Sequence, residues 1–325
     1  QRAHRLPFNY MGYRLGKANV IGSNSVSAVL FDHHNRLWVG TDKDGLYLLD
    51  NQKHLLRHYD RNVPSTILNL KEDSKGRIWA GSFAQGLGYF DTSLSWHQQN
   101  YGIGLHTSAF GLVCDHNGNI WVGTMGEGLV CIHNDGSSYF YRMKKGAENH
   151  RGMNSLPNNY ILGMSLSLDQ KRLYICSSVG ISCFNLVTHS FVDFFHTNCL
   201  NYGHSTRCAI EDRRGDLWIG TDHGLICYNI KNHCQRKYTI KDGLSNENIQ
   251  SLHLDNKGKL WVGTSHGLNR INPATGSVIC FFANNGLQSN EFGINAVAGN
   301  SSGKLVFGGT GGITWFNPYL IVSHA

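Results

Sequence analysis

Short apolar runs recur along the chain, and polar turns rich in glycine and aspartate separate them. The clearest unit begins with an apolar run and an Asp-x-x-Gly turn, continues as Leu-Trp-Val-Gly-Thr, turns again and ends as Gly-Leu, two apolar residues and Asp or Asn. Apolar runs of about 4 to 8 residues between such turns are typical of β-strands. Sustained helical periodicity is absent from the sequence. The pattern therefore predicts an all-β protein.

This unit occurs seven times, which makes the repeat the main signal in the sequence. Its copies begin at Asp32, Asp73, Asp115, Asp169, Asp212, Asp255 and Asn300. The aromatic position of the second strand falls at Trp38, Trp79, Trp121, Tyr174, Trp218, Trp261 and Val306, at intervals of 41 to 53 residues. A period of roughly 40 to 50 residues is typical of β-propeller blades rather than of helical repeats. We predict a seven-bladed β-propeller of four-stranded antiparallel blades.

Each recurring feature of the unit has an expected structural role. The Asp should bond its own backbone while the turn glycine takes a positive φ. The glycine in the second strand weakens a strand, so we expect it to allow neighbouring sheets to pack closely, with the Trp filling the space between blades. Fourth strands are expected at 55–59, 139–141, 191–195 and 278–282.

The two ends of the chain predict how the ring closes. The seventh copy finishes at Phe316 and Asn317, and Pro318 leaves poor material for a fourth strand. Before the first copy, Phe8 to Tyr13 resembles an outer strand that lacks a blade, and its pairing with the last blade would remove both open edges. The chain is thus expected to be one propeller, with residues 1–20 closing the last blade and with blades at 21–62, 63–103, 104–153, 154–200, 201–243, 244–286 and 287–325.

Composition refines this prediction only slightly. The 38 glycines fit a chain that turns often, and no stretch approaches the roughly 20 apolar residues of a membrane-spanning helix. The net charge of +7 comes without a basic run. It therefore favours anionic partners weakly and predicts no nucleic-acid contact. None of the nine cysteines forms a CxxC pair, and Cys131, Cys183 and Cys227 occupy equivalent places, which favours buried thiols over a metal or redox site.

The repeat, Asp-x-x-Gly-x-Leu-Trp-φ-Gly-Thr-x-x-Gly-Leu, resembles the two-component regulator propeller repeat over essentially the whole chain, although Tyr174, Cys176 and Ser177 depart from it. The resemblance implies the second propeller in the periplasmic sensor region of a hybrid two-component system from a gut bacterium. Such receptors carry a preceding propeller, a following β-sandwich and a cytoplasmic histidine kinase, and signal as homodimers. In that family, oligosaccharides bind the periplasmic part and switch on polysaccharide-utilisation genes.

The candidate ligand site lies on the face where the turns between second and third strands meet the links between blades. Asn, Arg, His and aromatic side chains, which suit sugar hydroxyls and rings, gather in the long link between blades three and four and in the next link. The predicted ligand-binding residues are Arg151, Asn159, Tyr160, His204, Arg207, His223 and His266. The alternative for each Asn is a simple turn former.

Two other functions stay open from the sequence alone. Equivalent turn positions at His223 and His266 allow a histidine-lined centre like that of streptogramin lyase-like propellers, and any propeller face can serve as an interaction scaffold. The sequence shows no nucleophile elbow, in which a GxSxG serine lies between a strand and a helix, and it has no HExxH helix or P-loop. We therefore predict a binding module without catalytic residues, metal or cofactor, and the positive charge favours uronic or sulfated sugars as ligands.

Overall fold

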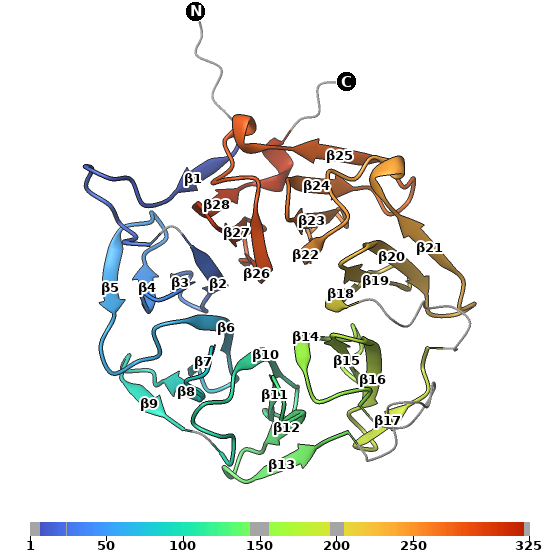
Figure 1. Ribbon diagram of the computed structural model, residues 1–325, viewed down its shortest axis with the longest axis horizontal. Helices are drawn as coiled ribbons and strands as arrows, with labels where there is room; N and C mark the ends of the chain where they lie inside the picture. The colour runs from blue at the N-terminus through green and yellow to red at the C-terminus, as the bar shows by residue number, and fades with distance from the viewer. Residues whose placement is uncertain (1–6, 24, 100, 144–155, 196–204, 322–325) are drawn as a thin grey trace, which may run out of the picture.

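The chain forms a ring of seven four-stranded antiparallel sheets (Figure 1). This computed structural model describes residues 7–23, 25–99, 101–143, 156–195 and 205–321, and all the sheets lie within these ranges. In each sheet the strands follow one another in chain order from the centre of the ring outward, except at the seam between the two ends. The predicted seven-bladed propeller is confirmed.

The strands of the first three blades are β2 (Val26–Phe31), β3 (Leu37–Thr41), β4 (Leu46–Leu49) and β5 (Leu55–Tyr59); β6 (Ile67–Glu72), β7 (Ile78–Ser82), β8 (Leu87–Phe90) and β9 (Trp96–Gln98); and β10 (Ala109–Cys114), β11 (Ile120–Thr124), β12 (Leu129–Ile132) and β13 (Ser138–Tyr141). Blades four and five contain β14 (Ile161–Leu166), β15 (Arg172–Ser177), β16 (Gly180–Asn185) and β17 (Ser190–Val192); and β18 (Thr206–Glu211), β19 (Asp216–Thr221), β20 (Gly224–Asn229) and β21 (Gln235–Tyr238). The last two contain β22 (Ile249–Leu254), β23 (Leu260–Thr264), β24 (Leu268–Ile271) and β25 (Val278–Phe281); and β26 (Phe292–Gly299), β27 (Leu305–Gly309), β28 (Gly312–Phe316) and β1 (Asn9–Met11). Short 3-10 helices follow at η2 (Ile240–Asp242), η3 (Ala283–Asn285) and η4 (Pro318–Leu320).

The N-terminal strand closes the ring, as the sequence predicts. In Figure 1 the blue β1 lies beside the red β28, and the two pair antiparallel with Asn9 opposite Trp315 and Met11 opposite Ile313. Because β1 supplies the outer strand of blade seven, the edges at the two chain ends are paired with each other.

The aspartate of each regular hairpin does more than cap its turn. In blade two, Asp73 Oδ1 accepts hydrogen bonds from the backbone N–H groups of Lys75 and Arg77, both at 2.9 Å, and Gly76 takes a φ of 76°. Asp73 Oδ2 also accepts a hydrogen bond from the buried Trp79 Nε1 at 2.9 Å. The same aspartate to tryptophan bond recurs in blades one, three, five and six at 2.8 to 3.0 Å. The carboxylate therefore joins the hairpin to the core.

The hairpin of blade four differs in one detail from the repeat expected from the sequence. Asp169 does not occupy the hairpin position of the other aspartates: Ser167 does, with its N–H donating to Arg172 O at 2.9 Å and its Oγ accepting from Arg172 N at 3.0 Å. The turn is one residue longer than in the other blades. Tyr174, in the place of the Trp, donates its hydroxyl to Glu211 Oε2 of blade five at 2.9 Å.

Close approach between blades explains the glycine in the second strand. A Cβ on Gly81 would lie 2.4 Å from the backbone oxygen of Ala109, on the innermost strand of blade three. One on Gly40 would lie 2.7 Å from Ile67, on the innermost strand of blade two. Trp79 is fully buried in the same interface, packed with Ala109 and Leu112. The predicted roles of the glycine and the tryptophan are confirmed.

Replacing Gly81 with alanine should lower the free energy of unfolding by about 2 kcal/mol, because the new methyl group meets a backbone atom that cannot rotate away. Urea unfolding followed by tryptophan fluorescence measures the change. The control is Gly215→Asn: a Cβ there meets nothing within 4 Å, and Asn35 holds the equivalent turn position in blade one with a φ of 58°. Equal losses in the two variants would contradict the role assigned to close packing.

Candidate functional site

The face predicted to bind ligand has a continuous backbone framework. We call it the linker face, because turns between second and third strands meet the links between blades there. In blade one, Asp42 N donates to Ser25 O at 3.1 Å and Gly45 N donates to Ser65 O at 2.8 Å, and blade six repeats the second bond between Gly267 N and Asn290 O. The turn of each of these blades is thus bonded to the next link, which holds the loops in fixed positions.

Asn159 and Tyr160 stand together at the entry to blade four. Asn159 Oδ1 accepts from Met143 N at 2.7 Å, and its backbone oxygen accepts from Gly126 N at 2.9 Å and Gly128 N at 3.2 Å. Asn159 therefore braces the turn of blade three. The Tyr160 side chain lies next to Gly126 and is half exposed, at 50% of its full area. Of this pair, Tyr160 presents the surface that a ligand can reach.

Arg207 lies on β18, the innermost strand of blade five, and is partly buried. Its Nη1 donates to Asn248 Oδ1 and, at 3.1 Å, to Gln250 Oε1, both in blade six. Two amides thus hold one side of the guanidinium. The remaining N–H groups of the planar fork are the ones that an incoming acceptor would meet.

The side chain of Asn295 forms hydrogen bonds across the centre of the ring, which sequence analysis did not predict. It lies in the irregular part of β26, between the paired residues Phe292 and Val297, and has a φ of 56°. Its Nδ2 donates to Leu162 O of blade four at 3.1 Å and to Arg207 O of blade five at 2.8 Å. Because blade seven adjoins blades one and six, these bonds span the central channel. In the structure β26 is eight residues long, against six in β2, a difference that the repeat pattern of the sequence does not reveal.

His223 and His266 occupy equivalent turns, as predicted. Each backbone N–H donates to the threonine two residues earlier, Thr221 or Thr264, at 3.0 Å. The His223 Nδ1 lies 3.1 Å from Asp222 Oδ1, and 59% of the His223 side chain is exposed. Burial acts to raise the pKa of Asp222, but the hydrogen bond and charge of His223 outweigh it and lower that pKa.

The predicted residues that the structure describes come from three consecutive blades. Asn159 and Tyr160 belong to blade four, Arg207 and His223 to blade five, and His266 to blade six. Arg151 and His204 lie outside the described residues.

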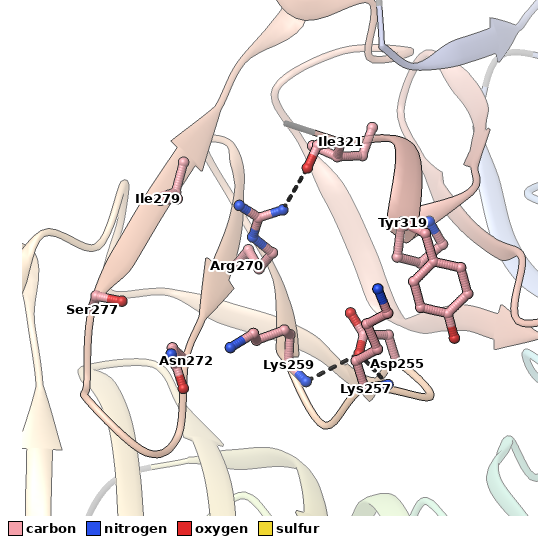
Figure 2. A pocket seen from close by; sticks show the side chains of 10 residues that line it. Asp255, Lys257, Lys259, Arg270, Asn272, Ser277, Ile279, Tyr319 and Ile321 are labelled. Atoms are coloured by element: carbon pink, nitrogen blue, oxygen red, sulfur yellow. Dashed lines mark hydrogen bonds between the residues drawn. The ribbon is translucent and has the colours of Figure 1, made fainter. Parts of the chain in front are cut away.

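The opposite face contains cavities that sequence analysis did not anticipate. We call it the hairpin face, because it carries the turns between first and second strands and between third and fourth strands. A cavity of about 280 Å³ lies between blade six and η4. Figure 2 shows that Arg270, on β24, faces Ile321. Arg270 Nη1 donates to Ile321 O at 2.9 Å, and its guanidinium lies 5.6 Å from the Trp261 ring centroid. Burial lowers the Arg270 pKa, while the Asp255 charge acts to raise it.

Three cations, Lys257, Lys259 and Arg270, line this cavity. The Lys257 Nζ lies 4.6 Å from the ring centroid of Tyr319, and Lys259 lies beside Asp255 (Figure 2). An adjoining cavity of about 690 Å³ shares Lys257 and Lys259 and adds Arg213 and Arg214. In the sequence these residues look like ordinary solvent-facing turn positions, and only the ring brings the turns of two blades together.

The thiols in equivalent positions lie in or against the core. Burial raises the pKa of Cys131 and Cys183 to about 12, so both stay protonated at neutral pH. The eight cysteines in the described ranges are unpaired. Those ranges contain no group of three or more His, Cys, Asp or Glu placed to hold a metal ion, and no helix long and apolar enough to cross a membrane.

Sequence comparison identifies the repeat family. The family described as two component regulator propeller matches residues 21–43, 104–126, 200–223 and 243–266. These four segments of the chain are two-component regulator propeller repeats. The matched segments include the β2–β3, β10–β11, β18–β19 and β22–β23 hairpins, so the family pattern coincides with the aspartate and tryptophan hairpins described above. No curated protein matches the chain in sequence.

Solved structures show where this repeat architecture recurs. The extracellular domain of one hybrid two component system from B. thetaiotaomicron matches with a TM-score of 0.81 and 22% identity, over 96% of this chain and 41% of that chain. A second such domain from B. thetaiotaomicron matches with a TM-score of 0.76 and 18% identity, over 96% and 40%. A catalytically inactive histidine-to-alanine variant of virginiamycin B lyase from Staphylococcus aureus, solved with quinupristin, matches with a TM-score of 0.74 and 13% identity, over 95% and 98%. At these identities the likeness establishes the propeller fold.

Proposed function

We propose that this chain is the extracytoplasmic sensor propeller of a hybrid two-component receptor and that it binds oligosaccharides. The observation that carries the proposal is the match of two-component regulator propeller repeats in four blades. The likeness to extracellular domains of hybrid two component systems over 96% of the chain supports the same role. In this proposal the chain binds a ligand and catalyses no reaction, and kinase activity belongs to the parent protein.

The proposal places the chain in the periplasm, within a larger receptor. This chain covers 41% of the similar extracellular chain, a share that leaves room for a preceding propeller and a following β-sandwich. We propose both domains as partners, together with a second copy of the receptor in a homodimer. Signalling then requires that ligand binding changes how these domains contact one another.

On the linker face, Tyr160 is the residue best placed to contact a sugar. Its half-exposed ring can cover the apolar side of a pyranose, and Asn159 fixes the backbone beside it. Arg207 is held by Asn248 and Gln250, so it would present its free N–H groups in a fixed direction. A fixed donor and an exposed ring suit the recognition of sugars better than they suit proton transfer.

The lyase alternative has less support in this chain. Asn295 bridges blades four, five and seven across the channel where a histidine-lined centre would lie. His223, moreover, is largely exposed on its turn, beside Asp222. We therefore favour binding over catalysis.

Replacing Tyr160 with alanine should weaken oligosaccharide binding at least tenfold, because the ring would no longer cover the sugar. Calorimetry of the chain against defined oligosaccharides measures the affinity, and product analysis of the same mixtures detects any turnover. The midpoint of thermal unfolding should change little, since the side chain is half exposed.

The matched control is Tyr139→Ala, which removes a tyrosine of similar exposure, 58%, from the outer strand β13. Wild-type affinity in the Tyr160 variant would exclude Tyr160 from the site. Turnover of any oligosaccharide would instead contradict the proposal of a binding module.

A further inference from the structure

We propose that a cleft on the hairpin face, at the seam between blades seven and one, binds an acidic sugar unit. The cleft has a volume of about 630 Å³ and is formed by β1, the end of β28, η4 and the turn between β4 and β5. The residues that carry the argument are Asn9, Asn51, Gln52, Lys53, Lys304 and Trp315. We call it the seam cleft. It lies on the face opposite Tyr160, and the proposal does not rest on a signalling role.

Two neighbouring ammonium groups give the seam cleft its charge. Lys53 and Lys304 both line it, and its lining contains no Asp or Glu. A smaller cavity of about 60 Å³ shares both lysines. Burial lowers the pKa of Lys53, and the charge of Lys304 lowers it further, against the opposing charge of Asp50. Two cations that repel each other in a half-buried cleft create a site that an anion would stabilise.

The charges at the seam are not neutralised by neighbouring acids. Within the described ranges, no carboxylate oxygen lies within 4.0 Å of either lysine Nζ. Asp50, whose charge acts to raise the pKa of Lys53, has other hydrogen-bond partners. Its Oδ1 accepts hydrogen bonds from the backbone N–H groups of Gln52 at 2.9 Å and His54 at 2.8 Å, and its Oδ2 lies 3.2 Å from His54 Nδ1.

The structure also fixes the position of the first ammonium group. Lys53 has a φ of 68° in the tight turn between β4 and β5, and its Nζ donates to Asn51 O at 3.2 Å. The same Nζ lies 5.3 Å from the ring centroid of Trp315, a distance at which the ring attracts the cation. Little side-chain freedom remains to be lost when an anion binds, which favours affinity.

The volume of the seam cleft and the neutral amides in its lining indicate a ligand that is larger than an inorganic ion. A volume of about 630 Å³ accommodates a small organic ligand. The amides of Asn51 and Gln52 add donors and acceptors next to the lysines, as hydroxyl groups require. A sugar with a carboxylate or sulfate group combines both chemistries. Such a ligand would touch β1 of blade seven and the turn of blade one, and so would bridge the closing seam.

The cavity in Figure 2 is the weaker candidate for an anion. Asp255 lies among its cations, and one N–H group of Arg270 already donates to Ile321 O. Lys259 of that cavity nevertheless offers a matched control, since it is also a lysine on the hairpin face that lines a cavity.

The test measures binding of defined probes to the chain by calorimetry at low salt. The probes are N-acetylglucosamine 6-sulfate, glucuronic acid, neutral N-acetylglucosamine and inorganic sulfate. We expect the two acidic sugars to bind and the neutral sugar not to bind. Lys304→Gln should weaken binding at least tenfold, as should Lys53→Asn, in which asparagine tolerates the positive φ. Lys259→Gln should leave the affinity unchanged.

Several results would overturn the proposal. They are absence of binding by both acidic sugars at millimolar concentration, equal affinity for the neutral sugar, or full affinity in Lys304→Gln. Inorganic sulfate that binds as tightly as the sugars would reduce the seam cleft to a simple anion site and remove its sugar specificity. An equal loss in Lys259→Gln would show a general charge effect rather than a local site. Neither Tyr160→Ala nor Tyr139→Ala should affect these measurements, so failure here is distinguishable from failure of the sensor proposal.

Discussion

Replacing Asp115 with alanine should lower the free energy of unfolding by about 3 kcal/mol or more. The carboxylate accepts hydrogen bonds from two backbone N–H groups, those of Asn117 at 2.9 Å and Asn119 at 3.0 Å, and from Trp121 Nε1 at 2.8 Å. Trp121 is fully buried, so its N–H would lose its partner without gaining water. An unpaired buried donor costs about 1 to 3 kcal/mol, and each lost bond to a charged group costs about as much. Urea unfolding at pH 7 measures the loss.

The same change at Asp169 should cost only about 1 kcal/mol, because Asp169 is exposed and water replaces the partners that are lost. That carboxylate accepts from Lys171 N at 3.0 Å and Ser167 Oγ at 2.5 Å, and makes no bond to Tyr174, whose hydroxyl donates to Glu211. If both alanine variants lost equal stability, the contact between aspartate and tryptophan would not be the reason why the regular hairpins resist unfolding.

The regular blades show how much of the fold could be predicted from the sequence. Period, strand order and ring closure follow from local patterns, because each blade repeats the same turns and apolar runs. The role of Gly81 follows as well, since a glycine inside a strand usually marks a bulge, a bend or the close approach of another backbone. The bond from Asp73 to Trp79 does not follow, because the turn alone is a sufficient reason for an aspartate at that position.

In blade four, sequence similarity alone assigns the hairpin position to the wrong residue. Asp169 resembles the other hairpin aspartates in sequence, yet Ser167 takes their structural place and the turn is one residue longer. A hairpin position is defined by its backbone pairing, which a serine hydroxyl can satisfy as well as a carboxylate. The deviation at Tyr174 is linked to this change, because its hydroxyl finds its acceptor on the next blade, at Glu211.

The candidate sites were less predictable because a ring brings together residues that are far apart in sequence. Asn295 meets Leu162 and Arg207 across the channel at separations of 133 and 88 residues. Lys53 belongs to blade one and Lys304 to blade seven, so the two lysines become neighbours only when the ring closes. Single side chains such as Tyr160 can be nominated from composition, whereas a cleft made by two chain ends cannot.

Replacing Phe8 with alanine should lower the free energy of unfolding by about 4 kcal/mol. Phe8 is buried, with 3% of its area exposed, and its ring lies 4.8 Å from that of Phe316 and 5.1 Å from that of Phe281, both in edge-on contact. Phe316 belongs to β28 and Phe281 to β25, so the side chain joins the closing strand to blades six and seven at once. Denaturant unfolding measures the loss, and hydrogen exchange of the β28 amides reports whether β1 detaches.

Tyr10→Ala is the control, because it removes a large ring from β1, two residues after Phe8, at a position that is 43% exposed. We expect a loss below about 1 kcal/mol and unchanged exchange in β28. In each of the other blades the four strands follow one another in the chain, whereas the outer strand of blade seven, β1, comes from the opposite end of the chain. Its backbone pairs with β28 over Asn9–Met11, and such a short strand needs an apolar anchor to stay in register. Similar losses in the two variants would mean that the backbone ladder alone holds the ring closed, while a larger loss in Phe8→Ala would identify Phe8 as that anchor.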